Sequence, residues 1–288
     1  MELDPLLLSR IQFAFVVCFH AIFPVFTIGL ASTIAGFEFL SFKTGNPIWQ
    51  RLSKFWIQVF AVVFGIGVVS GIVMSFQFGT NWSNFSYATA NFLGPVLSYE
   101  VVTAFFLEAA FLGVLLFGRD KVPQGVHLFA ACMVALGTFI SSFWILAANS
   151  LMQTPQGLEL VNGIYHVSSW SEALFTPSFG YRFLHMALAS FLTAALVVAG
   201  VSAWFLLKNR EFEANRKALS IALWFLLFLA PAQALVGDFH GINTLKYQPM
   251  KVAAMEGNWE TQKGVPLLLF AIPDKEEQTN HFEVKIPK

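Results

Sequence analysis

The chain has 288 residues, of which 56% are hydrophobic and only 12% are charged, whereas an ordinary soluble domain carries about 25% charged residues. Its 17 basic and 17 acidic residues cancel, so no overall field attracts nucleic acid or an acidic partner. This composition argues against a soluble enzyme and for an integral membrane protein.

Six apolar stretches are long enough to cross a bilayer, which takes about 20 mostly apolar residues in a helix. These stretches cover residues 11–40, 55–78, 95–118, 127–149, 183–207 and 218–237. They lack the polar face of a helix that lies on the surface of a soluble core. The sequence therefore predicts an all-α integral membrane protein, with a bundle of about six transmembrane helices in residues 1–237 and a polar segment in residues 238–288.

The start of the chain, MELDPLLLSR, is acidic and lacks the basic region of a cleaved signal peptide, so we expect the first span to be retained. The two cysteines, Cys18 and Cys132, lie in different predicted spans and in no CxxC or CxxCH motif. The sequence therefore predicts neither a disulfide framework nor a covalently attached c-type haem.

Basic residues are enriched in cytoplasmic loops. In this chain they gather between spans one and two, three and four, and five and six: Lys43, Arg51, Lys54, Arg119, Lys121, Lys208, Arg210, Arg216 and Lys217. The loop between spans two and three contains none. We therefore expect the N-terminus and residues 238–288 to lie outside the cytoplasm.

Four ionisable residues, His20, Glu100, Glu108 and His185, fall in the outer half or centre of the predicted spans. Such residues are costly inside a membrane and usually mark function. Glu100 and Glu108 are eight residues apart, so an α-helix would separate them by about 12 Å along its axis and about 80° around it. They suit either a proton path or a pair of protonated glutamic acids bonded to neighbouring helices.

Two of the histidines are candidate metal ligands, because neutral imidazole binds haem iron. His20 and His185 could equally be hydrogen-bonded structural residues or proton carriers. Arg182 lies one helical turn from His185, where it can pair with a haem propionate or extend to the membrane interface.

The remaining polar features carry less information. For three other histidines we expect surface roles: His127, His166 and His281. The stretch KVAAMEGNWE (251–260) reads by composition as a solvated surface helix, and its Lys251 and Glu256 do not share a helical face well.

Six stretches that run in order along the chain carry a family resemblance: SRIQFAFVVCFHAIFP (9–24), FQFGTNWS (76–83), YEVVTAFFLEAAFLG (99–113), FWILAANSLMQTPQG (143–157), YRFLHMA (181–187) and GDFHGINTLKYQPMKVAAMEGNWE (237–260). With these, the chain resembles subunit I of the cytochrome bd-type quinol oxidases. The last stretch is most similar to the cyanide-insensitive branch, which has a short quinol-binding loop.

The resemblance implies roles for the two histidines. His20 matches the ligand of a high-spin haem at the oxygen-reducing site, and His185 matches one axial ligand of the low-spin haem b. The implied cofactors are low-spin haem b together with high-spin haem b and haem d, or a second haem b in place of haem d. Arg182 is the implied propionate partner.

The resemblance also implies a reaction. Glu100 and Glu108 match glutamates that serve the haem pair and proton delivery, and Lys251 and Glu256 match residues of the quinol site. The implied enzyme oxidises quinol outside and reduces dioxygen to water with protons from the cytoplasm. It would lie in the bacterial cytoplasmic (inner) membrane as a multi-pass protein, in contact with lipid and with subunit II, and in some members with a very small accessory subunit.

The family's subunit has nine spans, whereas this sequence ends with VKIPK inside the expected quinol loop. We therefore expect the N-terminal portion of the subunit: a fragment, a truncated product or one piece of a split subunit. The three further spans of the family carry the methionine opposite His185, a glutamate ligand and a Gly-Arg-Trp motif. Two alternatives stay open: a haem- or quinone-binding membrane protein without oxidase activity, which fits the missing spans, or a proton-coupled transporter, in which Glu100 and Glu108 would couple protons to substrate movement.

Overall fold

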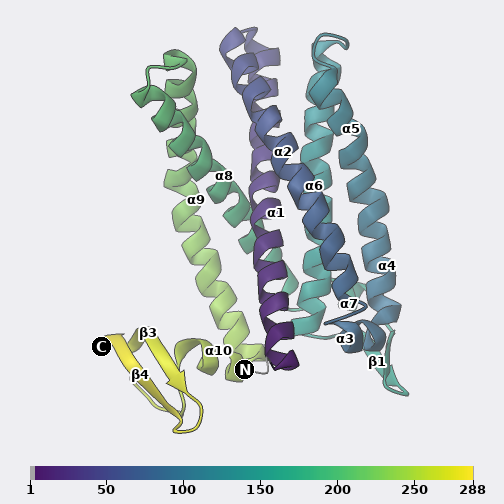
Figure 1. The fold of residues 1–288 in the computed structure, drawn as a ribbon, viewed down its shortest axis with the longest axis vertical. Coiled ribbons are helices and arrows are strands. Elements are labelled where there is room, and N and C mark those ends of the chain that lie inside the picture. Colours follow the sequence, from purple (N-terminus) through teal and green to yellow (C-terminus); the bar gives the residue numbers. More distant parts are fainter. Residues whose placement is uncertain (1–3, 288) are drawn as a thin grey trace.

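The computed structural model describes residues 4–287 as a bundle of long helices (Figure 1). Six helical segments are long and apolar enough to cross a membrane. They are α1 (Pro5–Thr44), α2 (Pro47–Gln77), the run of α4 (Ala90–Glu100), η1 (Val101–Phe105) and α5 (Phe106–Phe117), then α6 (Gln124–Gln153), the pair α7 (Trp170–Leu174) and α8 (Phe179–Leu207), and α9 (Phe212–Tyr247). The predicted helical membrane fold with six spans is confirmed.

The long helices run alternately up and down, and α1 lies centrally, in contact with α2, α6 and α8. The connections at residues 45–46, 118–123 and 208–211 all lie at one end of the bundle, which we call the basic end (top of Figure 1). The chain begins at the opposite end, which we call the N-terminal end. The basic loops that predicted a common side of the membrane thus do lie together.

The two-residue connection between α1 and α2 shows how local sequence sets these boundaries. Gly45 ends α1 in the left-handed conformation, with φ of 63°, which glycine adopts without a steric penalty. The Asn46 side chain then accepts a hydrogen bond from the backbone N–H of Ile48 at 3.0 Å, and Pro47 occupies the first helical position of α2. Both residue types are favoured at those cap positions.

The last span is longer than predicted. The apolar stretch ends at residue 237, but α9 continues without a break to Tyr247. The added turns carry polar side chains, including Asp238, His240 and Asn243. An apolar pattern ends where polar residues begin, whereas a helix continues as long as its backbone hydrogen bonds do. The segment after residue 237 therefore starts as helix rather than as loop.

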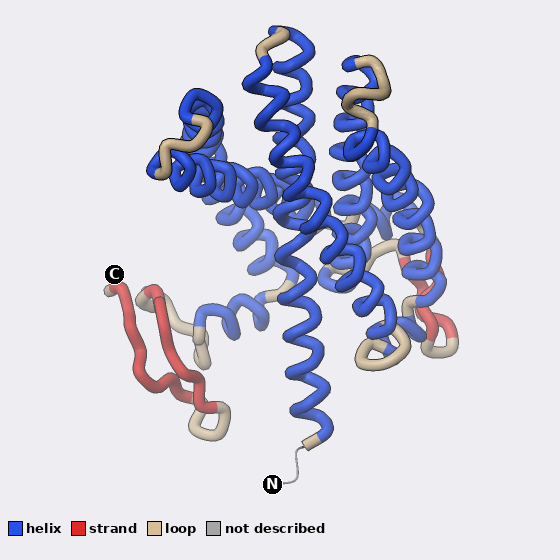
Figure 2. The backbone as a smooth tube through the Cα atoms, turned by 45° about the horizontal axis from the view of Figure 1, so that its top comes forward, coloured by secondary structure: helices blue, strands red, loops and turns tan. Residues whose placement is uncertain are grey.

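Two short β-hairpins add to the predicted helical fold. β1 (Leu158–Val161) pairs with β2 (Ile164–Val167), and β3 (Leu267–Asp274) pairs with β4 (Thr279–Ile286), both antiparallel. Both hairpins lie at the N-terminal end of the bundle (red in Figure 2). The short helices α3 (Ser83–Ala88) and α10 (Pro249–Glu256) lie at the same end.

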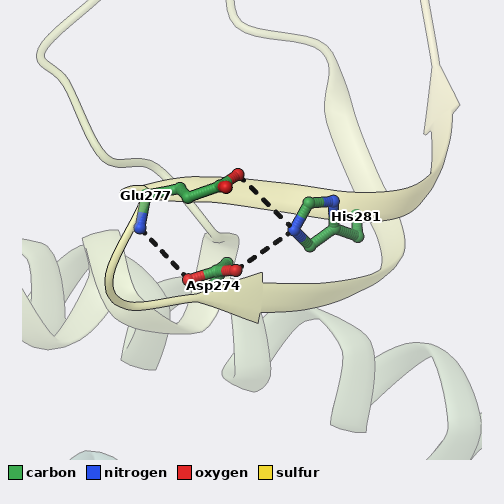
Figure 3. Close-up of side chains that lie close together, drawn as sticks. All are labelled: Asp274, Glu277 and His281. Atoms are coloured by element: carbon green, nitrogen blue, oxygen red, sulfur yellow. Dashed lines mark hydrogen bonds and ion pairs between the residues drawn. The ribbon is translucent and has the colours of Figure 1, made fainter.

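The turn between β3 and β4 is closed by side chains (Figure 3). Asp274 Oδ1 accepts hydrogen bonds from the backbone N–H groups of Glu276 and Glu277 at 2.9 and 3.1 Å, and Oδ2 lies 3.3 Å from His281 Nε2. The N–H of Glu277, then His281 and the N–H of Glu276, lower the pKa of the Asp274 carboxyl below its ordinary value. These exposed groups satisfy one another, and we assign them to turn closure.

A smaller packed core around Phe92 and Leu151 joins α4, α6 and α7, and the larger core lies toward the basic end. Its largest fully buried side chains include Trp56, Phe60, Leu30 and Ile34. On α1 the buried residues begin only at Thr27, and on α9 they end at Ala222. His20 on α1 therefore lies outside this core, and His185 on α8 faces the part of α9 that is not packed into it.

Candidate functional site

His20 is held against α2 by a directional pair of hydrogen bonds. Its Nδ1 lies 2.9 Å from Ser70 Oγ, and Ser70 Oγ donates to the carbonyl oxygen of Gly67 at 3.0 Å. Because the single hydroxyl proton goes to the carbonyl, the Ser70 oxygen accepts from His20, and Nδ1 is the protonated nitrogen. Nε2 then carries the free lone pair.

This arrangement fits a metal-binding histidine. Ligating histidines commonly donate their second ring N–H to a nearby acceptor, which orients the ring and fixes the tautomer. A Cβ atom at Gly71 would lie 3.2 Å from His20 Cε1, so the glycine leaves room for the imidazole. The donor set at His20 therefore fits a haem iron bound through Nε2.

His185 lies on α8 and faces α9, where Gln233 contacts its ring. The Gln233 amide nitrogen lies 3.1 Å from His185 Nε2 and 3.4 Å from Nδ1. A Cβ at Gly237 would lie 3.3 Å from His185 Cε1, so α9 approaches the ring closely. An iron bound at Nε2 would take the place of the Gln233 contact, so the fit at His185 requires that side chain to move.

One face of α9 beside His185 carries buried polar atoms without a hydrogen-bond partner among residues 4–287. They are Gln233 Oε1, His240 Nε2 and Asn243 Oδ1. The spacings of seven and three residues place the three side chains on one helical face. Because an unpaired buried polar atom is costly, this face suits the polar groups of a ligand. The sequence analysis did not single out these three residues, although their spacing in α9 indicates a shared polar face.

Two cations lie near each other at the N-terminal end. Arg182 Nη1 donates to Asn149 Oδ1 at 2.9 Å, and Lys251 Nζ donates to Gln153 Oε1 at 2.8 Å. The ion pairs among residues 4–287 include neither cation. Burial and, next, the positive charge of Arg182 lower the pKa of the Lys251 amine. A carboxylate of a bound ligand would relieve this repulsion, and the role of Arg182 as a propionate partner stays a prediction.

Gln153 fixes the segment around Lys251. Its Oε1 also accepts from Gln248 Nε2 at 3.0 Å, so the end of α6 holds the start of α10. Glu256, at the other end of α10, is exposed and accepts a hydrogen bond from Asn258 Nδ2 at 3.1 Å. The two residues expected at a quinol site thus share α10 but contact different groups.

Glu100 and Glu108 both face α6. Glu100 Oε1 accepts a hydrogen bond from Ser141 Oγ at 2.8 Å. Glu108 is buried, and a Cβ added at Gly137 would lie 2.5 Å from its Cγ. Ser141 and Gly137 are one turn apart on α6, so the two carboxyl groups meet neighbouring positions on one surface.

A π-helical turn, η1, corrects the angle expected between these glutamates. A π turn takes one more residue than an α turn, and so sets the following residues back by about 100°. The expected separation of about 80° becomes roughly 20° in the opposite sense. The sequence pattern could not show this extra residue, and η1 is what brings Glu100 and Glu108 to the same face.

A shallow, open apolar groove of about 410 Å³ lies between η1, α6 and α8. Trp144 Nε1 donates to Thr103 Oγ1 at 2.9 Å at its edge. The groove is lined by Thr103, Phe139, Ile140, Phe143, Trp144 and Phe183.

We predict that Gly137→Ala displaces Glu108, because the new methyl group would overlap its Cγ. Overpacking of this kind costs about 1–3 kcal/mol, and a lower melting temperature of the purified protein would measure it. Gly113→Ala on α5 is the matched control, since a Cβ there meets nothing within 4 Å. Equal melting temperatures for the two variants would contradict the prediction.

The expectation of a surface role for His127 is wrong. Its side chain is only 2% exposed and faces the equally buried carboxylate of Glu38. The sequence places His127 at the start of a span beside a loop, but the packing of α1 against α6 covers it. Glu38 was not singled out from the sequence, because no local pattern joins residues so far apart.

Three comparisons relate the chain to known proteins. The family model for cytochrome bd terminal oxidase subunit I matches residues 8–288. The chain is 36% identical to cytochrome bd ubiquinol oxidase subunit 1 of Bacillus subtilis (strain 168), over 99% of this chain and 61% of that protein. It is 35% identical to cytochrome bd-II ubiquinol oxidase subunit 1 of Escherichia coli (strain K12), over 99% of this chain and 56% of that protein.

The fold is similar to a chain in the structure of bd oxidase from Geobacillus thermodenitrificans, with a TM-score of 0.87 and 32% identity, covering 99% of this chain and 66% of that one. The chain thus spans between 56% and 66% of the length of these three relatives. Together, the family match over residues 8–288 and the shared fold show that the chain belongs to the cytochrome bd terminal oxidase subunit I family.

Proposed function

We propose that the chain acts within a terminal quinol oxidase, where quinol is oxidised at the N-terminal end and dioxygen is reduced to water. The observation that carries the proposal is the hydrogen-bond pair from His20 to Ser70 and on to Gly67, because it presents Nε2 as an iron ligand. The relatives named as ubiquinol oxidase subunits support the same reading.

The haem-binding roles follow from the donor sets. His20 would hold a high-spin haem, and His185 would hold the low-spin haem b once Gln233 has moved from its ring. Arg182 would bind a propionate, with the polar face of α9 nearby. We propose a high-spin haem b and a haem d, or a second haem b, as the other cofactors. When bound, haem supplies the one-electron and oxygen chemistry.

Quinol would be bound at the N-terminal end by the region around α10. Gln153 accepts a hydrogen bond from the Lys251 amine and so holds it in place, and the same amine can donate a further hydrogen bond to a quinol oxygen. Glu256 is exposed and can accept a proton that quinol releases to the outside. Residues 238–288 would form the start of the external quinol-binding loop.

Proton delivery would use the glutamates that face α6. Ser141 Oγ, already bonded to Glu100, can both accept and donate a proton. Because of η1, Glu108 lies on the same face of the helix as Glu100. It lies further toward the basic end. The two carboxyl groups and the hydroxyl can therefore hold protons at successive depths, with uptake from the basic end.

The membrane orientation and partners are part of the same proposal. The basic end would face the cytoplasm and the N-terminus would lie outside, in the bacterial inner membrane. Residues 1–237 would form the haem-binding bundle. Apolar side chains on the outer faces would contact lipid, subunit II and, in some complexes, a very small accessory subunit.

An optical spectrum of the purified complex, combined with oxygen uptake, tests the proposal. We expect the bands of low-spin and high-spin haem together with quinol-dependent oxygen consumption. Haem bands without oxygen uptake would favour a haem-binding protein without oxidase activity. A protein without haem bands would contradict the proposal.

We predict that Glu256→Ala slows quinol oxidation by about 10²-fold or more, the lower end of the range for a lost acid–base group, while dithionite still reduces the haems. Stopped-flow reduction by quinol measures the difference. Glu276→Ala, which removes an exposed carboxylate from the β3–β4 turn, is the control. Unchanged quinol kinetics in Glu256→Ala would contradict the prediction and would show that α10 is a surface helix without a role of Glu256 in quinol oxidation.

A further inference from the structure

Near the basic end, α1 and α6 bury a carboxylate against an imidazole. The side chains of Glu38 and His127 are 1% and 2% exposed, and Glu38 Oε2 lies 3.1 Å from His127 Nδ1. The other ring nitrogen of His127, Nε2, lies 3.1 Å from the carbonyl oxygen of Leu115. None of the roles proposed above uses this pair.

The hydrogen-bond chemistry of the pair requires an additional proton. A carbonyl oxygen can only accept, so His127 Nε2 must carry a proton to bond with Leu115. In a neutral ring Nδ1 then has a lone pair, which would face the lone pairs of an ionised Glu38. At 3.1 Å this contact is stable only when a proton lies between the two atoms, on either the ring or the carboxyl group.

The second oxygen of Glu38 is already satisfied. Glu38 Oε1 accepts hydrogen bonds from Arg119, in the loop after α5, and from the hydroxyl of Ser53 on α2. Among residues 4–287, Arg119 and His127 are the charged or titratable groups that contact the Glu38 carboxyl, and α8 contributes none. Arg119 alone balances the charge of Glu38, so the proton at His127 leaves the cluster with a net positive charge.

The pair adjoins a polar pocket that gives protons a route to it. The pocket has a volume of about 220 Å³ and lies among the ends of α1, α2 and α6 and the loop after α5. It is lined by Glu38, Ser41, Gly45, Pro47, Gln50, Arg119, Gln124 and His127. On the side toward Glu108 the packing is apolar and closed, since Leu115, Ala131 and Val134 are at most 2% exposed.

We propose that Glu38 and His127 form a proton-binding site, loaded through this pocket, that clamps α1 to α6 at the basic end. With the proton present, the two side chains hydrogen-bond and the helix ends are joined. When the proton leaves, two lone pairs face each other in a buried contact and the clamp opens. The apolar packing keeps this proton separate from the Glu100–Glu108 region. The site rests on the fold alone and not on the oxidase reaction.

A glutamine at position 38 provides a sharp test. In Glu38→Gln the amide N–H can donate to His127 Nδ1 while the amide oxygen accepts from Arg119 and Ser53, which reproduces the protonated pair without a titrating group. In the parent the hydrogen bond between the two side chains needs the proton, so its contribution is lost once the proton leaves at higher pH, whereas the amide of Glu38→Gln keeps its hydrogen bond at every pH.

We therefore expect the unfolding equilibrium constant of the parent, relative to Glu38→Gln, to rise by up to about tenfold per pH unit, the effect of one proton. Denaturant titration of the purified complex between mildly acidic and alkaline pH measures it. Parallel pH profiles for the two proteins would overturn the proposal.

A direct readout covers the case in which the variant folds poorly. Nitrogen NMR of the parent complex with labelled histidine should show both ring nitrogens of His127 sharing protons at mildly acidic pH, and loss of the Nδ1 proton on alkalinisation. A His127 ring that carries a proton on Nε2 alone throughout, with no protonated Glu38, would overturn the proposal.

Discussion

Replacing His20 with alanine is expected to remove the high-spin haem signal from the assembled oxidase and to abolish oxygen reduction, while the low-spin signal persists. The free lone pair on Nε2, set by the hydrogen bond from Nδ1 to Ser70, is the ligand that is lost. Ser70→Ala keeps the ligand but removes its orienting acceptor, and such partners typically change metal affinity by about 10–100-fold. Optical and magnetic spectra of purified variants measure both effects.

Ser75→Ala is the matched control for Ser70→Ala. Ser75 lies on the same helix and is exposed, and within residues 4–287 its hydroxyl bonds only to the carbonyl oxygen of Gly71, at 3.2 Å. Its haem content should equal that of the parent. Persistence of both haem signals in His20→Ala would make His20 a structural histidine and remove the main support for the proposed function.

Replacing Glu108 with glutamine is the second change with a large expected effect. Glutamine keeps the shape beside Gly137 but cannot carry a proton, so oxygen reduction should fall by about 10²–10⁴-fold, the range for a lost acid–base group. Reduction of the low-spin haem by quinol should remain. Oxygen uptake and flash kinetics of electron transfer separate the two steps.

Two further variants serve as comparisons for Glu108→Gln, one with a smaller expected effect and one with none. Ser141→Ala removes the hydroxyl bonded to Glu100 and should have a smaller effect, because water can take the place of a hydroxyl. Glu159→Gln removes an exposed carboxylate on β1 and should leave turnover unchanged. Full oxygen reduction in Glu108→Gln would show that this carboxyl is only a buried structural group.

The sequence was sufficient for the membrane architecture, since length and apolarity act locally. Each span can be read from about 20 consecutive residues, and the basic loops do lie together at one end. The ends of spans were less predictable. α9 continues for ten residues beyond the apolar stretch that ends at residue 237, because backbone hydrogen bonding does not stop at a change of polarity.

The sequence also singled out most candidate site residues, because an ionisable group in an apolar span stands out from its neighbours. His20, Glu100, Glu108 and His185 all lie in helices that cross the predicted membrane layer. Their partners did not stand out, since serine, glycine and glutamine are common and their roles depend on contact. Ser70, Gly137 and Gln233 are of this kind.

Only the tertiary structure decided which groups these residues contact. The π turn η1 depends on backbone hydrogen bonding after Glu100, and no residue pattern in the chain predicts it. It is this turn that brings Glu100 and Glu108 to one face. The contacts between Gln153 and Lys251, and between Glu38 and His127, join residues about 90 or more positions apart. By itself the sequence determined which groups are expensive to bury, because that cost belongs to the residue and its span. Which partner meets that cost depends on the packing of helices, and packing brings together side chains that no stretch of sequence contains.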